Sequence, residues 1–113
     1  MAGKLYIIVH PQDLRHALFN IPTDGARLLG IKAELDRIRR NEDYLEIMSD
    51  EDPSKLHRFM PPPNEVEVYL CGFYSYGCVV DQFDALKKAG YDVHVHGKAL
   101  YPDNFVWRIR FVG

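Results

Sequence analysis

The fold is decided by residues 66–96, which read VEVYLCGFYSYGCVVDQFDALKKAGYDVHVH. Apolar residues alternate with polar ones along 66–70, which is typical of a strand, and Gly72 marks its carboxyl end. An apolar stripe over 77–89 predicts a helix, and renewed alternation over 91–96 predicts the next strand. A strand, a helix and a strand in this order predict a right-handed crossover between two parallel strands.

The rest of the chain extends this pattern on both sides. The apolar run 5–9 predicts a buried strand, and apolar residues at spacings of three and four predict an amphipathic helix over 25–40. The stretch between them is interpreted as a loop through Asn20, Ile21 and Pro22. Alternation predicts two more strands, at 44–48 and at 105–111. Together these elements predict an α/β sandwich with a mostly parallel sheet.

Composition limits the class of protein. The chain has 113 residues, of which 47% are apolar, so we expect one domain over residues 1–113. No apolar run approaches the roughly 20 residues that cross a bilayer, and the net charge is −2, so neither a membrane nor a nucleic-acid partner is expected. The apolar run before His10 is too short for a signal peptide, and two cysteines make no disulfide framework, so we expect a cytoplasmic protein.

The candidate site lies where ligands bind to parallel α/β sheets, beyond the carboxyl ends of the strands. That rule selects His10 and the segments 73–78 and 96–98, each of which follows a predicted strand. Cys78 falls in the first turn of a predicted helix, where free N–H groups and the helix dipole favour a thiolate. Cys78 is therefore a candidate nucleophile, and the N–H groups of Gly77 and Cys78 are candidates for an oxyanion site. The alternative is that Cys78 is a small buried residue that packs the helix on the sheet.

Two segments, CGFYSYGCV at 71–79 and DALKKAGYDV at 84–93, carry a family resemblance. They resemble the isochorismatase-like cysteine hydrolases, which have Cys-Gly after a strand, then a nucleophilic Cys-Val and a helix that runs through Ala-Leu to Gly-Tyr. Ser75 stands where that family has threonine, and it keeps the hydroxyl group. At 10–12, His-Pro-Gln resembles the family's Asp-x-Gln, with histidine in place of the catalytic aspartate. The resemblance implies a three-layer αβα sandwich with a flavodoxin-like sheet.

The same resemblance implies a hydrolase that acts on an amide, ester or related acyl-type bond of a small molecule, without a cofactor or a metal. Cys78 would be its nucleophile, His10 would act as base, and Lys55 is the candidate for the family's lysine. For His10 the alternative is a histidine at a strand end that bonds to a loop carbonyl. The candidates for substrate binding are Gln12, Tyr74, Ser75, Tyr76 and Gly77.

Two further features leave alternatives open. His94 and His96 share one face of a predicted strand, as a metal-binding pair would, but we interpret them as histidines satisfied at a helix–sheet or subunit contact. The missing aspartate also supports a second hypothesis, a catalytically inactive relative that acts through protein contacts or as a homo-oligomer. Its expected contact surface is the apolar face of the strand at 105–111, formed by Phe105, Trp107, Ile109 and Phe111.

Overall fold

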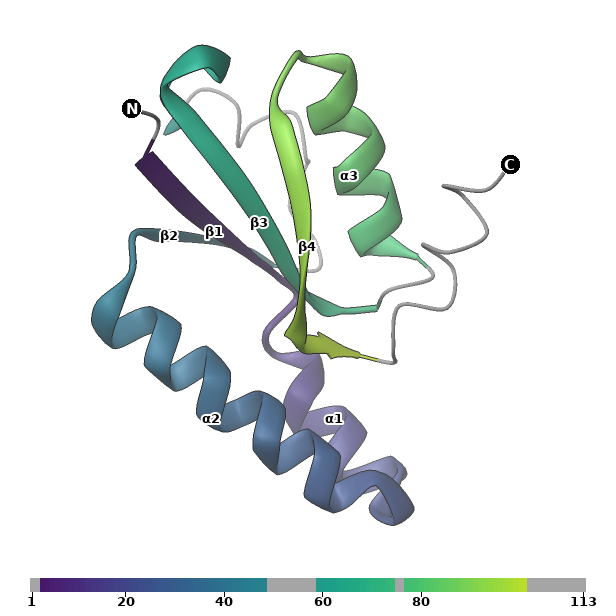
Figure 1. Ribbon diagram of the computed structural model, residues 1–113. Coiled ribbons are helices and arrows are strands. Elements are labelled where there is room, and N and C mark those ends of the chain that lie inside the picture. The colour runs from purple at the N-terminus through teal and green to yellow at the C-terminus, as the bar shows by residue number, and fades with distance from the viewer. Residues whose placement is uncertain (1–2, 49–58, 75–76, 102–113) are drawn as a thin grey trace.

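The computed structural model describes residues 3–48, 59–74 and 77–101 (Figure 1). The strands in these ranges are β1 (Gly3–Val9), β2 (Tyr44–Ile47), β3 (Val66–Phe73) and β4 (Asp92–Tyr101). The α-helices are α1 (Asp13–Asn20), α2 (Gly25–Asn41) and α3 (Cys78–Lys88). Single 3₁₀ turns at Pro22–Asp24 and Pro63–Glu65 precede α2 and β3. Lys55, Ser75, Tyr76 and the strand predicted at 105–111 lie outside the described residues.

The four described strands form one parallel sheet in the order β2-β1-β3-β4. Helices α1 and α2 cover one face of the sheet and α3 covers the other (Figure 1). This arrangement confirms the predicted three-layer α/β sandwich, and the strand order agrees with a flavodoxin-like sheet. The carboxyl ends of β1 and β3 lie side by side in the middle of the sheet, so the segments that follow them leave from one place.

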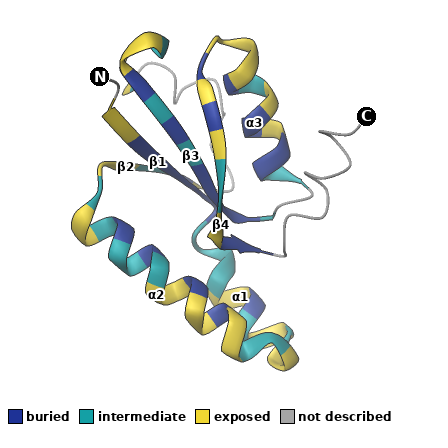
Figure 2. Ribbon diagram, in the orientation of Figure 1, coloured by how far each residue is buried: buried dark blue, intermediate teal, exposed yellow. Residues whose placement is uncertain are grey.

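Each face of the sheet has its own core, because successive residues of a strand point to opposite sides. Tyr6 and Ile8 of β1 pack with the buried stripe of α2, which includes Leu28, Leu35 and Ile38. On the other face, Ile7 and Val9 of β1 pack with residues of α3, which include Val79, Phe83 and Leu86. Figure 2 shows the result: most of β1 and β3 is buried, the start of β1 and parts of β4 are exposed, and the outer faces of the helices are exposed.

Helix α1 corrects the prediction of a loop between the first strand and the helix at 25–40. Its apolar residues Leu14, Ala17 and Leu18 have helical spacing and pack on the core beneath α2. Only Ala17 is fully buried, and a helix of eight residues is marginal by itself. The helix is therefore stabilised by tertiary packing that the local sequence does not reveal.

Strand β4 is longer than predicted and runs to Tyr101, so residues 96–98 lie within it and not beyond its carboxyl end. Its pairing with β3 is irregular, because Val95 is opposite Leu70 but Leu100 is opposite Gly72. The four residues 96–99 thus stand opposite the single residue Cys71, an excess of three, and they form a bulge. Before the bulge the odd-numbered Val95 packs on the α3 face, whereas after it the even-numbered Leu100 does so.

Gly72 fixes the closest contact between β3 and β1. Its φ is 109°, and a Cβ at this position would lie 2.1 Å from the carbonyl oxygen of Val9. A side chain is therefore excluded both by the backbone conformation and by the neighbouring strand. Glycine here lets the ends of the two strands meet and brings the segments that follow them together.

Candidate functional site

His10 directly follows β1 and is 8% exposed. Its backbone adopts a φ of 49°, a left-handed conformation that is uncommon outside glycine. Two backbone hydrogen bonds hold it, because His10 N donates to the Ile47 oxygen at 2.7 Å and His10 O accepts from Asp13 N at 3.0 Å. The imidazole Nδ1 lies 3.8 Å from Asp13 Oδ2. The imidazole thus lies beside a carboxylate.

Asp13 was not among the residues predicted for the site. It is the first residue of α1, and it lies at the same sheet edge as His10. The local signal was present, since an acidic residue in the first turn of a helix is favoured by the helix dipole. It was missed because the segment 13–20 was interpreted as a loop.

Cys78 is the first residue of α3 and is partly buried, as the prediction placed it. The turn before it is closed by Tyr74, whose carbonyl oxygen accepts from Gly77 N at 3.1 Å and from Val79 N at 3.2 Å. The N–H of Gly77 is therefore occupied and is not available to an oxyanion in this conformation. This corrects the prediction that Gly77 and Cys78 together form the oxyanion site.

The pKa of the Cys78 thiol is raised above its ordinary value, mainly by burial and further by the carboxylates of Asp81 and Asp13. The Cys78 backbone N–H acts in the opposite direction, but its effect is smaller. The sequence analysis predicted a lowered pKa from the helix N-terminus alone. Burial reverses that expectation, and two carboxylates add to its effect: Asp81, one turn further along α3, and Asp13, which comes from another helix.

These contacts define the candidate site as His10, Asp13 and Cys78. Asp13 connects the other two, because it lies beside the imidazole and its charge acts on the thiol. His10 and Cys78 themselves form no hydrogen bond with each other in this structure. The three side chains share one edge of the sheet without the direct contact of a formed catalytic dyad.

The predicted substrate-binding residues separate in the structure. Gln12 lies in the turn between β1 and α1, and its Oε1 is buried without a hydrogen-bond partner. It also lines a hollow of about 590 Å³ along α1. Tyr74 packs against the core on the α1–α2 face, with its ring 5.7 Å from that of Phe73, whereas Cys78 packs against the core on the α3 face. The described residues that line the hollow along α1 include none of His10, Asp13 and Cys78, so the hollow does not connect Gln12 with the thiol.

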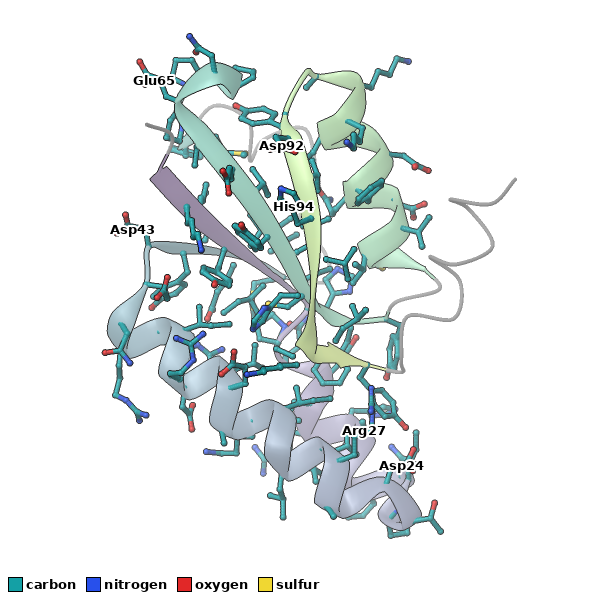
Figure 3. The ribbon with its side chains drawn as sticks, in the orientation of Figure 1. Asp24, Arg27, Asp43, Glu65, Asp92 and His94 are labelled. Carbon is teal, nitrogen blue, oxygen red and sulfur yellow. The ribbon has the colours of Figure 1, made fainter. Side chains whose placement is uncertain are left out.

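The two histidines of β4 have separate partners. His94 is exposed, stacks on Tyr69 with ring centroids 5.0 Å apart, and lies 3.3 Å from Asp92 Oδ1 (Figure 3). His96 bonds to Glu34 of α2 through its Nε2 atom. Within the described ranges, no group of three His, Cys, Asp or Glu side chains is placed to hold a metal ion.

Comparisons of the chain with protein-family models, curated proteins and solved structures gave no match. The resemblance to isochorismatase-like hydrolases, which rests on short segments, therefore stays a prediction. In the part of the chain that the structure describes, no helix combines the length and the apolar composition needed to cross a membrane.

Proposed function

We propose that the protein is a cysteine hydrolase that cleaves an amide, ester or related acyl-type bond of a small molecule. The main support is the position of Asp13, whose carboxylate lies 3.8 Å from the imidazole of His10 and also acts on the thiol of Cys78. A thiol, an imidazole and a carboxylate at one sheet edge are the groups of a nucleophile, a base and an orienting residue. The motif resemblance around Cys78 adds independent support.

The raised pKa of Cys78 determines how such an enzyme works. The thiol is protonated at neutral pH, so a base has to take its proton as the attack proceeds. His10 takes that proton while the Cys78 sulfur bonds to the acyl carbon, and the leaving alcohol or amine departs with the proton. Water then cleaves the thioester, giving one proton to His10, which returns it to the sulfur. Asp13 beside Nδ1 stabilises the imidazolium in both steps.

Gln12 fits the binding of an acyl-type substrate. Its buried Oε1 has no hydrogen-bond partner, and a buried acceptor of this kind is unfavourable unless a donor reaches it. The N–H of an amide substrate is such a donor. We therefore assign Gln12 to substrate orientation within the proposed hydrolase.

An activated ester tests the proposal. Incubation with p-nitrophenyl acetate should release nitrophenol and leave an acetyl group on Cys78, which mass spectrometry of proteolytic peptides locates. His10→Asn keeps a residue that tolerates a positive φ, and it should reduce acylation by about a hundredfold, as expected for the loss of a general base. Cys71→Ser is the matched control, because Cys71 is fully buried. Acylation as slow in the wild type as in Cys78→Ala contradicts the hydrolase.

A catalytically inactive protein that acts through protein contacts or self-association is the second candidate. It is favoured by the lack of a hydrogen bond between His10 and Cys78 and by the occupied N–H of Gly77. The contact surface predicted for it, at 105–111, lies outside the described residues. Light scattering of the full chain and of a chain without residues 104–113 tests self-association. A monomer in both cases contradicts the homo-oligomer.

A further inference from the structure

A second hollow lies between α2 and the bulge of β4. It has a volume of about 600 Å³, which is within the range of small-molecule sites. Four of its lining residues are cations, Arg27, Arg37, Arg40 and Lys98, and one is a carboxylate, Glu34. We call it the α2–β4 groove. The chain as a whole has a net charge of −2, whereas the residues that line the groove carry a net positive charge.

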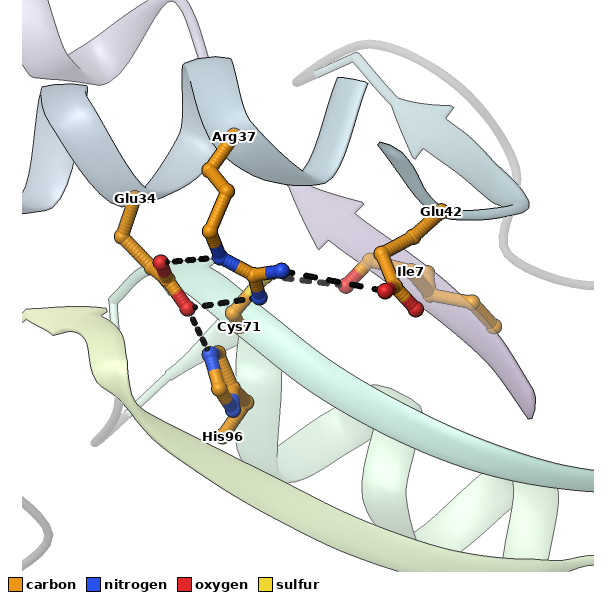
Figure 4. A network of polar contacts seen from close by, with 6 residues as sticks. All are labelled: Ile7, Glu34, Arg37, Glu42, Cys71 and His96. Atoms are coloured by element: carbon orange, nitrogen blue, oxygen red, sulfur yellow. Dashed lines mark hydrogen bonds and ion pairs between the residues drawn. The ribbon is translucent and has the colours of Figure 1, made fainter. Parts of the chain in front are cut away.

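The one carboxylate of the groove is already neutralised. Arg37 holds Glu34 in a forked contact, with Nε to Oε1 at 2.7 Å and Nη2 to Oε2 at 3.0 Å (Figure 4). His96 approaches the same carboxylate from β4. The hydrogen bond from Arg37 lowers the pKa of Glu34 to about 2, with a smaller contribution from His96, despite its partial burial. Glu34 therefore does not cancel the charge of the remaining cations.

Those remaining cations, Arg27, Arg40 and Lys98, form no close ion pair in the described part of the chain. Arg27 donates only to the carbonyl oxygen of Leu100, at 3.2 Å. On α2, Arg27 and Arg40 mark the two ends of the groove, and thirteen residues of helix correspond to about 20 Å. The cations of α2 are thus spread over most of the length of the helix, which suits an elongated anion.

The floor of the groove carries almost no side chains. Gly30 and Ala33 of α2 line it, and Gly97 of β4 lies opposite. A Cβ at Gly30 or Gly97 would meet nothing within 4 Å, so the space above both is open. None of the lining residues that the structure describes is aromatic, and a single nucleic-acid strand normally needs aromatic rings for its bases. The shape and chemistry favour a slim anion over stacked bases.

We propose that the α2–β4 groove binds the phosphate chain of a small molecule, either a linear polyphosphate or a nucleotide that carries one. Arginine matches the oxygens of a phosphate with its planar fork, and Lys98 adds a point charge from the opposite wall. The site is separate from the candidate site at His10 and Cys78 and does not depend on hydrolase activity.

Calorimetric titration with three probes tests the ligand class. Tripolyphosphate and ATP should each bind at least about tenfold more tightly than orthophosphate, because only they reach several cations at once. Binding of both should weaken as salt is added. Tighter binding of ATP than of tripolyphosphate identifies the nucleotide as the source, and equal binding identifies the phosphate chain alone. Equal affinity for all three probes, or tighter binding of a single-stranded oligonucleotide, overturns the proposal.

Substitutions locate the binding in the groove. Lys98→Gln should weaken tripolyphosphate binding by about tenfold, whereas Lys88→Gln, the same change at an exposed position of α3, should not alter it. Gly30→Leu fills the floor without changing any charge and should abolish binding, while Ala26→Leu places the same side chain on α2 outside the groove. Since nothing lies within 4 Å of the new Cβ at Gly30, this variant is expected to fold. Wild-type affinity in both groove variants contradicts the assignment.

Discussion

The groups around Cys78 and the groups that join α2 to β4 are held very differently. Glu34 is bound by Arg37 and by His96, and Arg37 also reaches Glu42 at 3.7 Å (Figure 4). At the sheet edge the side chains of His10 and Asp13 lie 3.8 Å apart, and Gln12 Oε1 is buried with no hydrogen-bond partner among the described residues. Glu34 and Arg37 of α2 are thus used to attach the helix to β4. The polar groups at the edge keep unused hydrogen-bonding capacity, which is what a ligand or a substrate needs.

The pKa shifts in the two regions are opposite in what they do to the charged form of the group. Contacts from Arg37 and His96 favour the charged form of Glu34, so its pKa falls to about 2. Burial and the carboxylates of Asp81 and Asp13 disfavour the charged form of Cys78, so its pKa rises. One environment stabilises its charge and the other opposes it. Because its surroundings disfavour the thiolate of Cys78, a bound ligand that alters those surroundings can change the protonation of this group.

The largest expected effect is at Gly72, which supports the sheet edge. Gly72→Ala places a Cβ 2.1 Å from Val9 O at a positive φ, so it should reduce the free energy of unfolding by about 3–5 kcal/mol. Urea unfolding followed by circular dichroism measures this. Gly97→Ala is the matched control, since its Cβ meets nothing within 4 Å. A Gly72→Ala protein as stable as Gly97→Ala contradicts the close contact between the strands.

Removal of the central carboxylate tests the α2–β4 contacts. Glu34→Gln should lower the free energy of unfolding by about 1–2 kcal/mol at pH 7, because Arg37 and His96 lose a charged partner. The unfolded glutamate has a pKa of about 4.3, so this stabilisation is complete above about pH 5. It is lost as the pH falls toward the folded pKa of about 2. Unfolding of both proteins between pH 7 and pH 2 should show the difference shrink.

The control for that experiment is Glu65→Gln, a change at an exposed position in the turn before β3 (Figure 3). It should leave both the stability and its pH dependence nearly unchanged. A constant difference between wild type and Glu34→Gln down to pH 2 would contradict the lowered pKa.

Alkylation of Cys78 tests the raised pKa of the thiol at the sheet edge. The ordinary pKa of a free thiol is about 8.5. Because the pKa of Cys78 is raised, its rate of alkylation by iodoacetamide should reach half of the maximum only above that pH. Asp81→Asn removes one carboxylate that opposes the thiolate, so it should increase the rate at pH 8 by about two- to threefold. Asp43→Asn, at an exposed position before β2, should have no effect. A rate that reaches half of its maximum below pH 7 would contradict the raised pKa of Cys78.

The smallest effect distinguishes the two histidines of β4. His94→Ala removes an exposed stacking contact with Tyr69 and should change the free energy of unfolding by at most about 0.5 kcal/mol. His96→Ala removes a partner of Glu34 and should reduce the free energy of unfolding by about 1 kcal/mol. Chemical denaturation of both variants under one set of conditions measures the ranking. Equal effects would show that His96 adds nothing to the attachment of α2.

Most of the fold could be predicted because strand and helix periodicity are local properties. The buried run of β1, the stripe of α2 and the 66–96 unit all appear in the sequence near their observed bounds. Helix α1 could not be predicted, because it is stabilised by contacts with α2 and not by its own eight residues. The length of β4 was also missed, since a bulge interrupts the alternation that marks a strand.

The site was predicted by position more accurately than by chemistry. His10 and Cys78 lie at the expected strand and helix ends, because the rule for parallel sheets depends only on topology. The direction of the Cys78 pKa shift was wrong, since it depends on Asp13 from a different helix and on burial. The partnership of Glu34 with His96 joins residues 62 positions apart, and no local pattern encodes such a pair.

The bulge in β4 changes which residues of the strand face α3: an odd-numbered residue does so before it and an even-numbered residue after it. Val95 and Leu100 both face α3 although one has an odd and the other an even number, so residues 96–99 absorb the difference. A deletion of one residue there would turn Leu100 toward α2 and Tyr101 toward α3, whereas a substitution at Gly97 or Lys98 leaves both in place. Chain length is therefore constrained in this segment, whereas a replacement at an open position such as Gly97 does not change which residues face α3. Natural variation in the α2–β4 groove should accordingly occur by replacement and not by insertion or deletion.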